Sequence, residues 1–190
     1  MLCDICLFLD SKTEDKIHRA WSILRTRGFS SPLLRSGGKP HLTLAIWENL
    51  EPELILDDIM DFAASHRAFP VTFSSIATFG RASGTVFLGP VITPSLLSVH
   101  ERLYRIFDEL SDKSEGLYRP GCWVPHCSLT LGLQPELILD AMSICLDIIN
   151  LPIRGWIREI GLLTFEKESV HSIRSYKLTD PHSSVKTSLL

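Results

Sequence analysis

The sequence has no hydrophobic run that approaches the roughly 18 to 20 apolar residues needed to cross a membrane. Its opening segment, MLCDICLFLD, also lacks the basic start and the small-residue cleavage site of a secretory signal peptide. We therefore expect a protein with no membrane association and a cytoplasmic location.

Excess positive charge is also missing, because 19 Lys and Arg residues stand against 22 Asp and Glu residues, for a formal net charge of −3. A protein that coats nucleic acid through bulk positive charge is therefore excluded, whereas a locally basic groove is not. The five cysteines are an odd number, which does not suit a closed disulfide framework. Reduced thiols in a reducing compartment are the simpler interpretation.

What is present is the composition of an ordinary globular domain. Of the 190 residues, 45% are hydrophobic and 22% are charged, and this proportion supplies enough apolar surface for a core. We predict a single domain over residues 1–180, a loosely ordered polar tail over 181–190, and a monomer.

Apolar periodicity and turn residues predict strands and helices that alternate for most of the chain. The predicted strands cover residues 2–9, 40–46, 71–79, 84–92, 122–131, 153–165 and 170–178. The predicted helices are one over residues 12–27 and three that open at Pro52, Pro94 and Pro135. A strand followed by a Pro-initiated helix therefore occurs twice, which indicates two duplicated lobes, each a small sheet with helices on one side.

The two corresponding strands carry the same short motif, PHLTL at 40–44 and PHCSL at 125–129. Because side chains alternate between the faces of a strand, each motif places an imidazole and a hydroxyl side by side. The predicted core-facing residues are Leu42, Leu44 and Ile46 in the first strand and Cys127, Leu129 and Leu131 in the second. The opposite faces carry His41 and Thr43 in the first strand and His126, Ser128 and Thr130 in the second.

The segments KPHLTLAIW (39–47) and WVPHCSLTLGL (123–133) resemble the two-histidine phosphoesterases, which include bacterial 2'-5' RNA ligases and cyclic nucleotide phosphodiesterases. The segment IATFGRASGTVFLG (76–89) is similar to the hairpin between the lobes of that family. The resemblance implies a bilobal α+β fold in which each lobe is a small antiparallel sheet with helices on its outer face. It also implies an active-site cleft between the lobes.

The chemistry of that family suits these residue types. Opening a 2',3'-cyclic phosphodiester needs a base that takes a proton from water and an acid that protonates the departing ribose oxygen, and histidine serves as either near neutral pH. His41 and His126 are the candidates for these roles, in either order, and Thr43 and Ser128 would stabilise the phosphoryl oxygens. This arrangement requires neither a metal nor another cofactor.

Other side chains near the motifs are candidates for contacts with a nucleotide or an RNA end that carries a cyclic phosphate. The cations on loops near the predicted cleft are Arg35, Lys39 and Arg81, which we expect to hold a phosphate. The aromatic residues that could stack on a base are Trp47, Phe79, Tyr118 and Trp123, with packing in the core as the competing interpretation.

Several alternatives remain open at this point. The same fold could bind RNA ends or nucleotides without turnover, or could cleave linear 2'-5' or 3'-5' RNA. A zinc site could be built from His41, His126 and either Cys122 or Cys127, although Cys127 is predicted to point away from His126. Cys3 and Cys6 form a C-x-x-C on a strand, where residues three apart face opposite sides.

A third copy of the motif, Pro181-His182-Ser183-Ser184, lies in the polar tail without alternating apolar residues behind it. We expect no function there. The natural substrate also stays open among a mononucleotide, an RNA end, a 2'-5' oligonucleotide and a cyclic phosphate of ADP-ribose.

Overall fold

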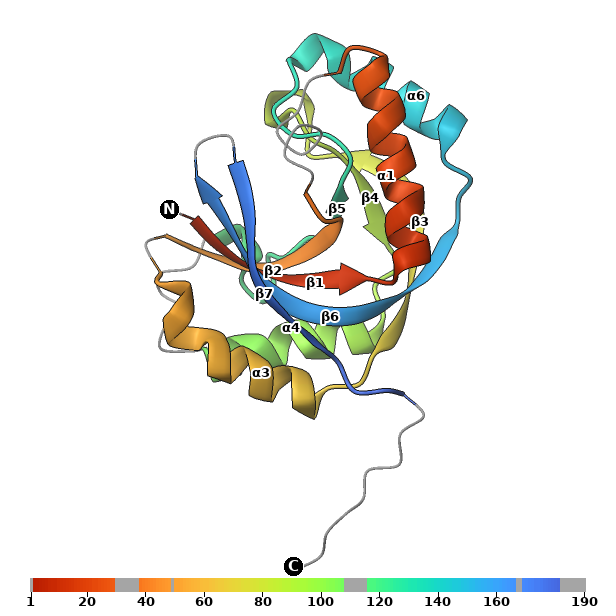
Figure 1. Ribbon diagram of the computed structural model, residues 1–190. Coiled ribbons are helices and arrows are strands. Elements are labelled where there is room, and N and C mark those ends of the chain that lie inside the picture. Colours follow the sequence, from red (N-terminus) through yellow and green to blue (C-terminus); the bar gives the residue numbers. More distant parts are fainter. Residues whose placement is uncertain (1, 30–37, 49, 108–115, 167–168, 182–190) are drawn as a thin grey trace, which may run out of the picture.

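The computed structural model describes residues 2–29, 38–48, 50–107, 116–166 and 169–181. Within these ranges the chain forms strands and α-helices in an order that agrees with the predicted one (Figure 1). The strands are β1 (Leu2–Leu9), β2 (His41–Glu48), β3 (Phe69–Thr78), β4 (Val86–Pro90), β5 (Cys127–Ser128), β6 (Ile153–Glu166) and β7 (Ser169–Lys177). The helices are α1 (Ser11–Thr26), α3 (Leu56–Ser65), α4 (Pro94–Ile106) and α6 (Ile138–Ile148). Short 3-10 turns are η1 (Pro52–Ile55), η2 (Arg81–Ser83), η3 (Gly116–Tyr118) and η4 (Pro135–Leu137).

All ladders between the named strands are antiparallel, which confirms the predicted α+β class. The strand order is β2-β1-β6-β3-β4-β5, and β7 pairs with β6 outside this path. The long strand β6 connects two groups of strands, because its residues 157–165 pair with β1 and its residues 153–157 pair with β3. Figure 1 shows β6 as a long curved ribbon that runs from β1 and β7 towards β3. The two groups thus belong to one hydrogen-bonded sheet.

The two ends of this strand path, β2 and β5, are in contact with each other. The path therefore curls back until its terminal strands are neighbours, although no ladder joins them. Because β2 carries the first PHxT/S motif and β5 carries the second, the fold brings together two segments that are far apart in the sequence.

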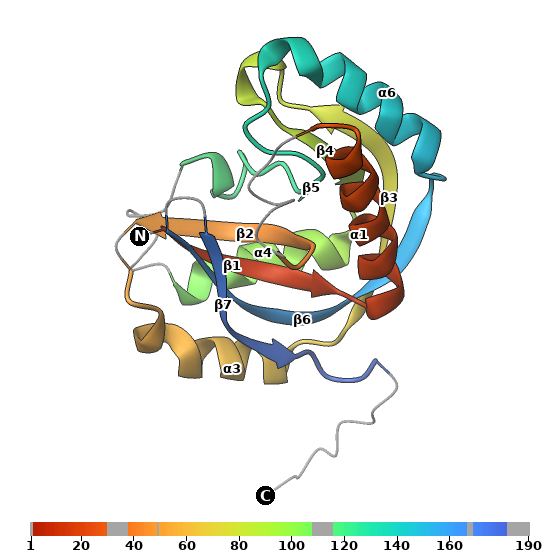
Figure 2. The same cartoon turned by 45° about the horizontal axis from the view of Figure 1, so that its top comes forward.

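The helices lie on two sides of this curled sheet (Figures 1 and 2). Helix α1 contacts α6 and β6, and α6 contacts β3 and β4. Thus α1, which follows β1 in the chain, packs beside the helix that covers the other group of strands. Helices α3 and α4 lie on the opposite side, where Trp47 of β2 packs edge-on against Phe107 at the end of α4.

The buried residues of α1 include Ile17, Trp21 and Leu24, which are the residues that helical spacing places on one face. The second motif strand differs from its prediction. A strand over 122–131 is wrong, because only Cys127 and Ser128 form β5. The chain before them is an irregular turn in which the N–H groups of Cys122 and Trp123 both donate to the carbonyl of Arg119.

No helix in the described part of the chain is long and apolar enough to span a membrane. The predicted tail over 181–190 lies outside the described residues except for Pro181, so it stays a prediction, and the third motif copy with His182 lies outside them as well.

A stability prediction follows from two glycines that both have positive φ. A Cβ at Gly84 (φ +65) would lie 2.5 Å from the backbone nitrogen of Leu133, whereas a Cβ at Gly28 (φ +88) would meet nothing within 4 Å. We expect Gly28→Ala to lower the free energy of unfolding by about 1 kcal/mol, the cost of left-handed backbone alone. Gly84→Ala should cost at least about 2 kcal/mol because a backbone clash is added.

Urea denaturation of both variants measures this difference. Equal losses of stability in the two variants would contradict the close approach of Gly84 to the segment that follows the second motif.

Candidate active site

The two motif histidines are held in the same way. The Nδ1 atom of His41 lies 2.7 Å from the carbonyl oxygen of Lys39, and the Nδ1 atom of His126 lies 2.8 Å from the carbonyl oxygen of Val124. Because a carbonyl can only accept, each Nδ1 carries the proton in this bond. Each neutral ring therefore keeps its lone pair on Nε2, which is the nitrogen available to exchange a proton with a ligand.

The hydroxyl residues also occupy equivalent places in their strands. Thr43 pairs with Cys6 of β1, and Ser128 pairs with Phe87 of β4. The Thr43 hydroxyl is buried and lies 3.8 Å from the Cys6 sulfur. His41 and Thr43 lie two residues apart on β2, as the sequence predicts, whereas Ser128 ends β5 and His126 lies directly before that strand.

Each motif is followed by a β-bulge. In β2, Ala45 pairs with Ile5 and Thr43 pairs with its neighbour Cys6, so Leu44 is an extra residue. After β5, the N–H groups of Leu129 and Thr130 both donate to the carbonyl of Val86, at 2.7 and 3.0 Å. Two residues opposite one partner define a bulge, and a bulge reverses the alternation of side chains beyond it.

This reversal corrects part of the prediction. Ile46 is only partly buried, and Leu131 is 37% exposed, although both were predicted to face the core. Thr130, predicted on the motif face, is fully buried and accepts a hydrogen bond from the backbone of Val86. Trp47 is 1% exposed in the core, so its predicted role in stacking on a base is wrong.

The two motifs are close to each other. The backbone N–H of His41 hydrogen-bonds to the buried thiol of Cys127, and β2 contacts β5. This thiol lies in the core, as predicted, and therefore away from a shared site with His126. No group of three or more potential metal ligands exists among the described residues, so the alternative zinc site has no support there.

Burial controls the charge of both imidazoles. Burial lowers the pKa of His41 from 6.5 to about 4, the carbonyl of Lys39 opposes this shift, and the charge of His126 lowers the pKa further. Burial also lowers the pKa of His126, against the opposing effect of the Val124 carbonyl. Both rings are therefore neutral at pH 7 in the free protein. Because the charge of His126 lowers the pKa of His41, removal of His126 is expected to change the titration of His41.

An apolar pocket of about 400 Å³ adjoins His126. Phe79 is 47% exposed, and its ring lies edge-on to the His126 ring with 4.9 Å between centroids. Tyr118 also lines this pocket, so the two aromatic candidates Phe79 and Tyr118 are close to a catalytic candidate. The remaining lining residues are Thr85, Leu117, Cys122, Val124 and Leu131.

The sequence offered Trp123 as a residue that could stack on a base, but in the structure its ring contacts other parts of the protein. Its indole Nε1–H donates to the carbonyl of Thr43 at 3.0 Å, and its ring stacks on His100 with 4.0 Å between centroids. Trp123 therefore contacts the first motif although it directly precedes the second.

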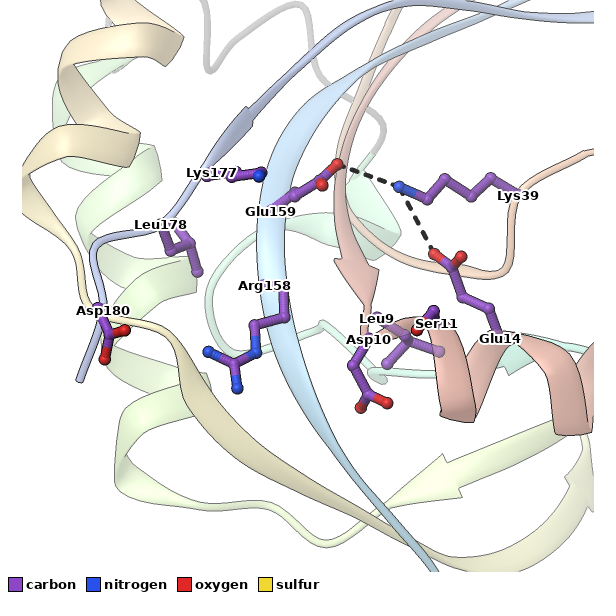
Figure 3. Close-up of a pocket in the computed structure, with 10 residues that line it drawn as sticks. All are labelled: Leu9, Asp10, Ser11, Glu14, Lys39, Arg158, Glu159, Lys177, Leu178 and Asp180. Carbon is purple, nitrogen blue, oxygen red and sulfur yellow. Dashed lines mark hydrogen bonds and ion pairs between the residues drawn. The ribbon is translucent and has the colours of Figure 1, made fainter. Parts of the chain in front are cut away.

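The structure treats differently the three cations that were predicted to hold a phosphate, which are Arg35, Lys39 and Arg81. Figure 3 shows the ammonium of Lys39 between two carboxylates, 3.1 Å from Glu159 and 3.5 Å from Glu14. These carboxylates already neutralise the charge of Lys39, so its predicted contact with a phosphate stays a prediction. Arg35 lies outside the described residues, and Arg81 is exposed on η2, where its role stays a prediction.

The pocket in Figure 3 has a volume of about 620 Å³ and includes two further cations, Arg158 and Lys177, that sequence reasoning did not single out. Their strands β6 and β7 carry no motif. The pairing of Glu159 with Lys177 in the sheet places Lys177 beside the residue whose carboxylate contacts Lys39.

An antiparallel α+β fold with two equivalent histidine and hydroxyl motifs on neighbouring strands is the arrangement of a two-histidine phosphoesterase. The family profile described as "2'-5' RNA ligase superfamily" matches residues 13–168, and the chain belongs to this superfamily. Comparison with curated protein sequences gives no match.

Solved structures share this fold. TT0787 of Thermus thermophilus superposes with a TM-score of 0.63 at 15% identity, covering 96% of this chain and 100% of TT0787. E. coli LigT complexed with 3'-AMP superposes with a TM-score of 0.58 at 16% identity, covering 93% of this chain and 97% of LigT. LigT complexed with NADP+ gives 0.57 at 17% identity, with coverage of 93% and 96%. At these identities the matches show the common fold alone.

The proximity of the two imidazoles predicts how they titrate. In the free protein, NMR titration of the ring protons should give His41 a pKa of about 4. His126→Gln removes the neighbouring charge, so it should raise the pKa of His41 while burial still keeps it below 6.5. Between pH 6.5 and about 4, His41 is protonated in the unfolded chain but neutral in the folded protein. The free energy of unfolding should therefore decrease as the pH falls from 6.5 towards 4. A His41 ring that titrates normally in the folded protein would contradict the burial of this group.

Proposed function

We propose that this protein is a metal-independent phosphoesterase that opens 2',3'-cyclic phosphodiesters of nucleotides or RNA ends by two-histidine general acid and base catalysis. The observation that carries the proposal is the repeated bond from Nδ1 to a carbonyl at His41 and His126. It supplies two imidazoles with free Nε2 atoms, one on β2 and one directly before β5, and these two strands contact each other. Membership of the superfamily supports a phosphoesterase or ligase-like reaction.

The roles of the two histidines follow from their different environments. His41 is the harder ring to protonate, since its pKa falls to about 4, so it acts as the base. Its Nε2 takes a proton from water while the water oxygen attacks phosphorus. The bond from phosphorus to one ribose oxygen breaks, and that oxygen takes the proton from Nε2 of protonated His126. Proton exchange with solvent then restores both rings.

His126 takes its proton from solvent when the substrate binds. Both imidazoles are neutral at pH 7 in the free protein because burial lowers both pKa values. An anionic phosphodiester between the rings stabilises an imidazolium and raises the pKa of the ring beside it. The hydroxyls of Thr43 and Ser128 donate to the phosphoryl oxygens as negative charge gathers there.

The apolar pocket beside His126 suits the base of the nucleotide. Phe79 and Tyr118 present aromatic surface in a space of about 400 Å³, and a stacked base gains about 1 to 3 kcal/mol from such contacts. This assignment places the nucleobase on the side of His126, the general acid, and therefore near the departing ribose oxygen.

Turnover of 2',3'-cyclic mononucleotides and of RNA ending in a cyclic phosphate is the direct test. His41→Ala and His126→Ala should each lower kcat by at least about 100-fold, the usual worth of general acid or base catalysis. His182→Ala is the matched control, since it removes the histidine of the third motif copy, and it should leave the rate unchanged.

Activity should also survive complete removal of metal ions with EDTA, because the proposed acid, base and donors are all protein groups. Loss of activity with EDTA that zinc or manganese restores would contradict the mechanism. Binding of cyclic nucleotides without turnover would favour a binding module. Cleavage of linear 2'-5' or 3'-5' dinucleotides in preference to cyclic phosphates would favour an RNA phosphodiesterase.

The pH dependence tests the assignment of the two roles. The active free protein has neutral His41 and protonated His126, so kcat/KM should fall below a pH of about 4 and fall again above the lowered pKa of His126. The maximum of kcat/KM should therefore lie below pH 6.5. The kcat profile should lie at higher pH, because the bound phosphate favours imidazolium. In His126→Ala the alkaline limb should disappear, and a bell that persists unchanged would show that another group is the acid.

A further inference from the structure

Two indole groups hydrogen-bond to the backbone of the two hydroxyl residues. The Nε1–H of Trp123 donates to the carbonyl of Thr43 at 3.0 Å, and the Nε1–H of Trp21 donates to the carbonyl of Ser128 at 3.1 Å. The two motifs are thus alike in two respects. In each motif the histidine bonds to a carbonyl through Nδ1, and the carbonyl of the hydroxyl residue accepts a hydrogen bond from an indole. Trp21 lies on α1 and Trp123 lies in the turn before β5.

The position of the two carbonyls explains why each needs such a donor. β2 and β5 end the strand path, so each has one edge without a ladder partner. A carbonyl on this edge lies between the sheet and the neighbouring elements, where it needs a hydrogen bond if water is excluded. The bonds of the indoles supply it. Along the same edge of β2, the N–H of His41 bonds to the thiol of Cys127.

Each indole comes from the part of the chain that holds the other motif. Trp21 lies between β1 and β2 in the sequence and bonds to β5, whereas Trp123 directly precedes β5 and bonds to β2. The pair therefore connects α1 to β5 and the turn before β5 to β2. These strands contact each other without a ladder, so side-chain bonds of this kind fix their relative position.

The indoles are themselves held in place. The ring of Trp123 is parallel to that of His100, with an interplanar angle of 5°, and the Nε2 of His100 bonds to the carbonyl of Tyr118 at 2.8 Å. His100 also hydrogen-bonds to the backbone of Leu44, the residue after Thr43. Trp21 is 6% exposed and packs edge-on against His18. A donor fixed this firmly restrains the peptide to which it bonds.

We propose that Trp21 and Trp123 are positioning residues that hold Ser128 and Thr43, and through them the spacing between His41 and His126, at the geometry that one phosphorus atom requires. The inference rests on the proposed function. The hydroxyl and the imidazole of each motif lie two residues apart on one short segment, so a shift of the bonded peptide moves both. A displacement of about 1 Å at a catalytic group can cost about 100-fold in rate.

The test uses the full chain with Trp21→Phe, Trp123→Phe and the double variant. Phenylalanine keeps an aromatic ring and removes the N–H donor. We expect each single variant to lower kcat on a 2',3'-cyclic nucleotide by roughly 10- to 100-fold with KM changed by less than about threefold, because positioning is lost while binding is kept. The pKa of His41 measured by NMR should rise, since His126 moves away and its repulsion weakens.

Trp156→Phe is the matched control. This tryptophan is also partly buried, but it lies on β6, where the guanidinium of Arg158 covers its ring. The control should leave kcat and the titration of His41 unchanged. Because the smaller ring could destabilise the fold, benzothienylalanine at position 123 replaces only the indole N–H by sulfur and keeps the ring size. It should reproduce the loss of kcat seen with Trp123→Phe.

The outcomes separate this inference from the proposed function. If the wild type turns over none of the phosphodiesters tested, the proposed function fails, and the His41 titration in the folded tryptophan variants still decides the positioning role. If the wild type is active and the benzothienylalanine protein keeps both its kcat and its His41 titration, the positioning role is overturned while the function stands.

Discussion

The contact between β2 and β5 is the constraint on which the candidate site depends. Each motif alone supplies one imidazole and one hydroxyl, and the proposed reaction needs both motifs together, because it requires an acid and a base for the same phosphate. The sheet achieves this because β6 pairs with β1 along one part of its length and with β3 along another, so the strand path can curl until its ends are neighbours. The core then fills the space behind both motifs, with Cys127 packed against the backbone of His41.

Burial of the imidazoles is the second constraint on the candidate site. It disfavours protonation of the rings in the free protein, but it strengthens the attraction between a protonated ring and a bound anion. Desolvation keeps both rings neutral in the free protein, which avoids two adjacent positive charges. The same low-dielectric setting strengthens the attraction between an imidazolium and a bound phosphodiester. The proposed acid thus acquires its proton when a substrate is present, and the bond of each Nδ1 to a carbonyl keeps Nε2 as the reactive atom in either state.

Much of this site could be predicted from the sequence, because a strand and a repeated motif are local patterns. The sequence alone shows that a Pro residue precedes each histidine and that His41 and Thr43 are two residues apart. The bulges after the motifs are not, since a bulge depends on which residue the partner strand places opposite Leu44 or Thr130. For this reason the sequence left Trp47 open between stacking on a base and packing in the core. The carboxylates around Lys39 were also missed, because Glu14 and Glu159 reach it only through the folded sheet.

A signal for the tryptophan pair was equally absent. Tryptophan near a motif suggests stacking on a base, and only the folded chain shows that the indoles of Trp21 and Trp123 donate to the opposite motif. Local patterns therefore pointed to the groups proposed to carry the chemistry, whereas the groups proposed to hold them in place are brought together by contacts between distant segments.

The packing of α1 has a consequence for how the molecule comes apart. This helix follows β1 in the chain but contacts α6 and donates through Trp21 to β5, so each half of the sequence contributes part of the packing of the other. A fragment that ends before α6 would expose the apolar face of α1 and remove the helix that contacts β3 and β4. The two halves of the sequence are thus bound into one cooperative unit, in which neither can be lost or exchanged as a separate module without opening the core of the other.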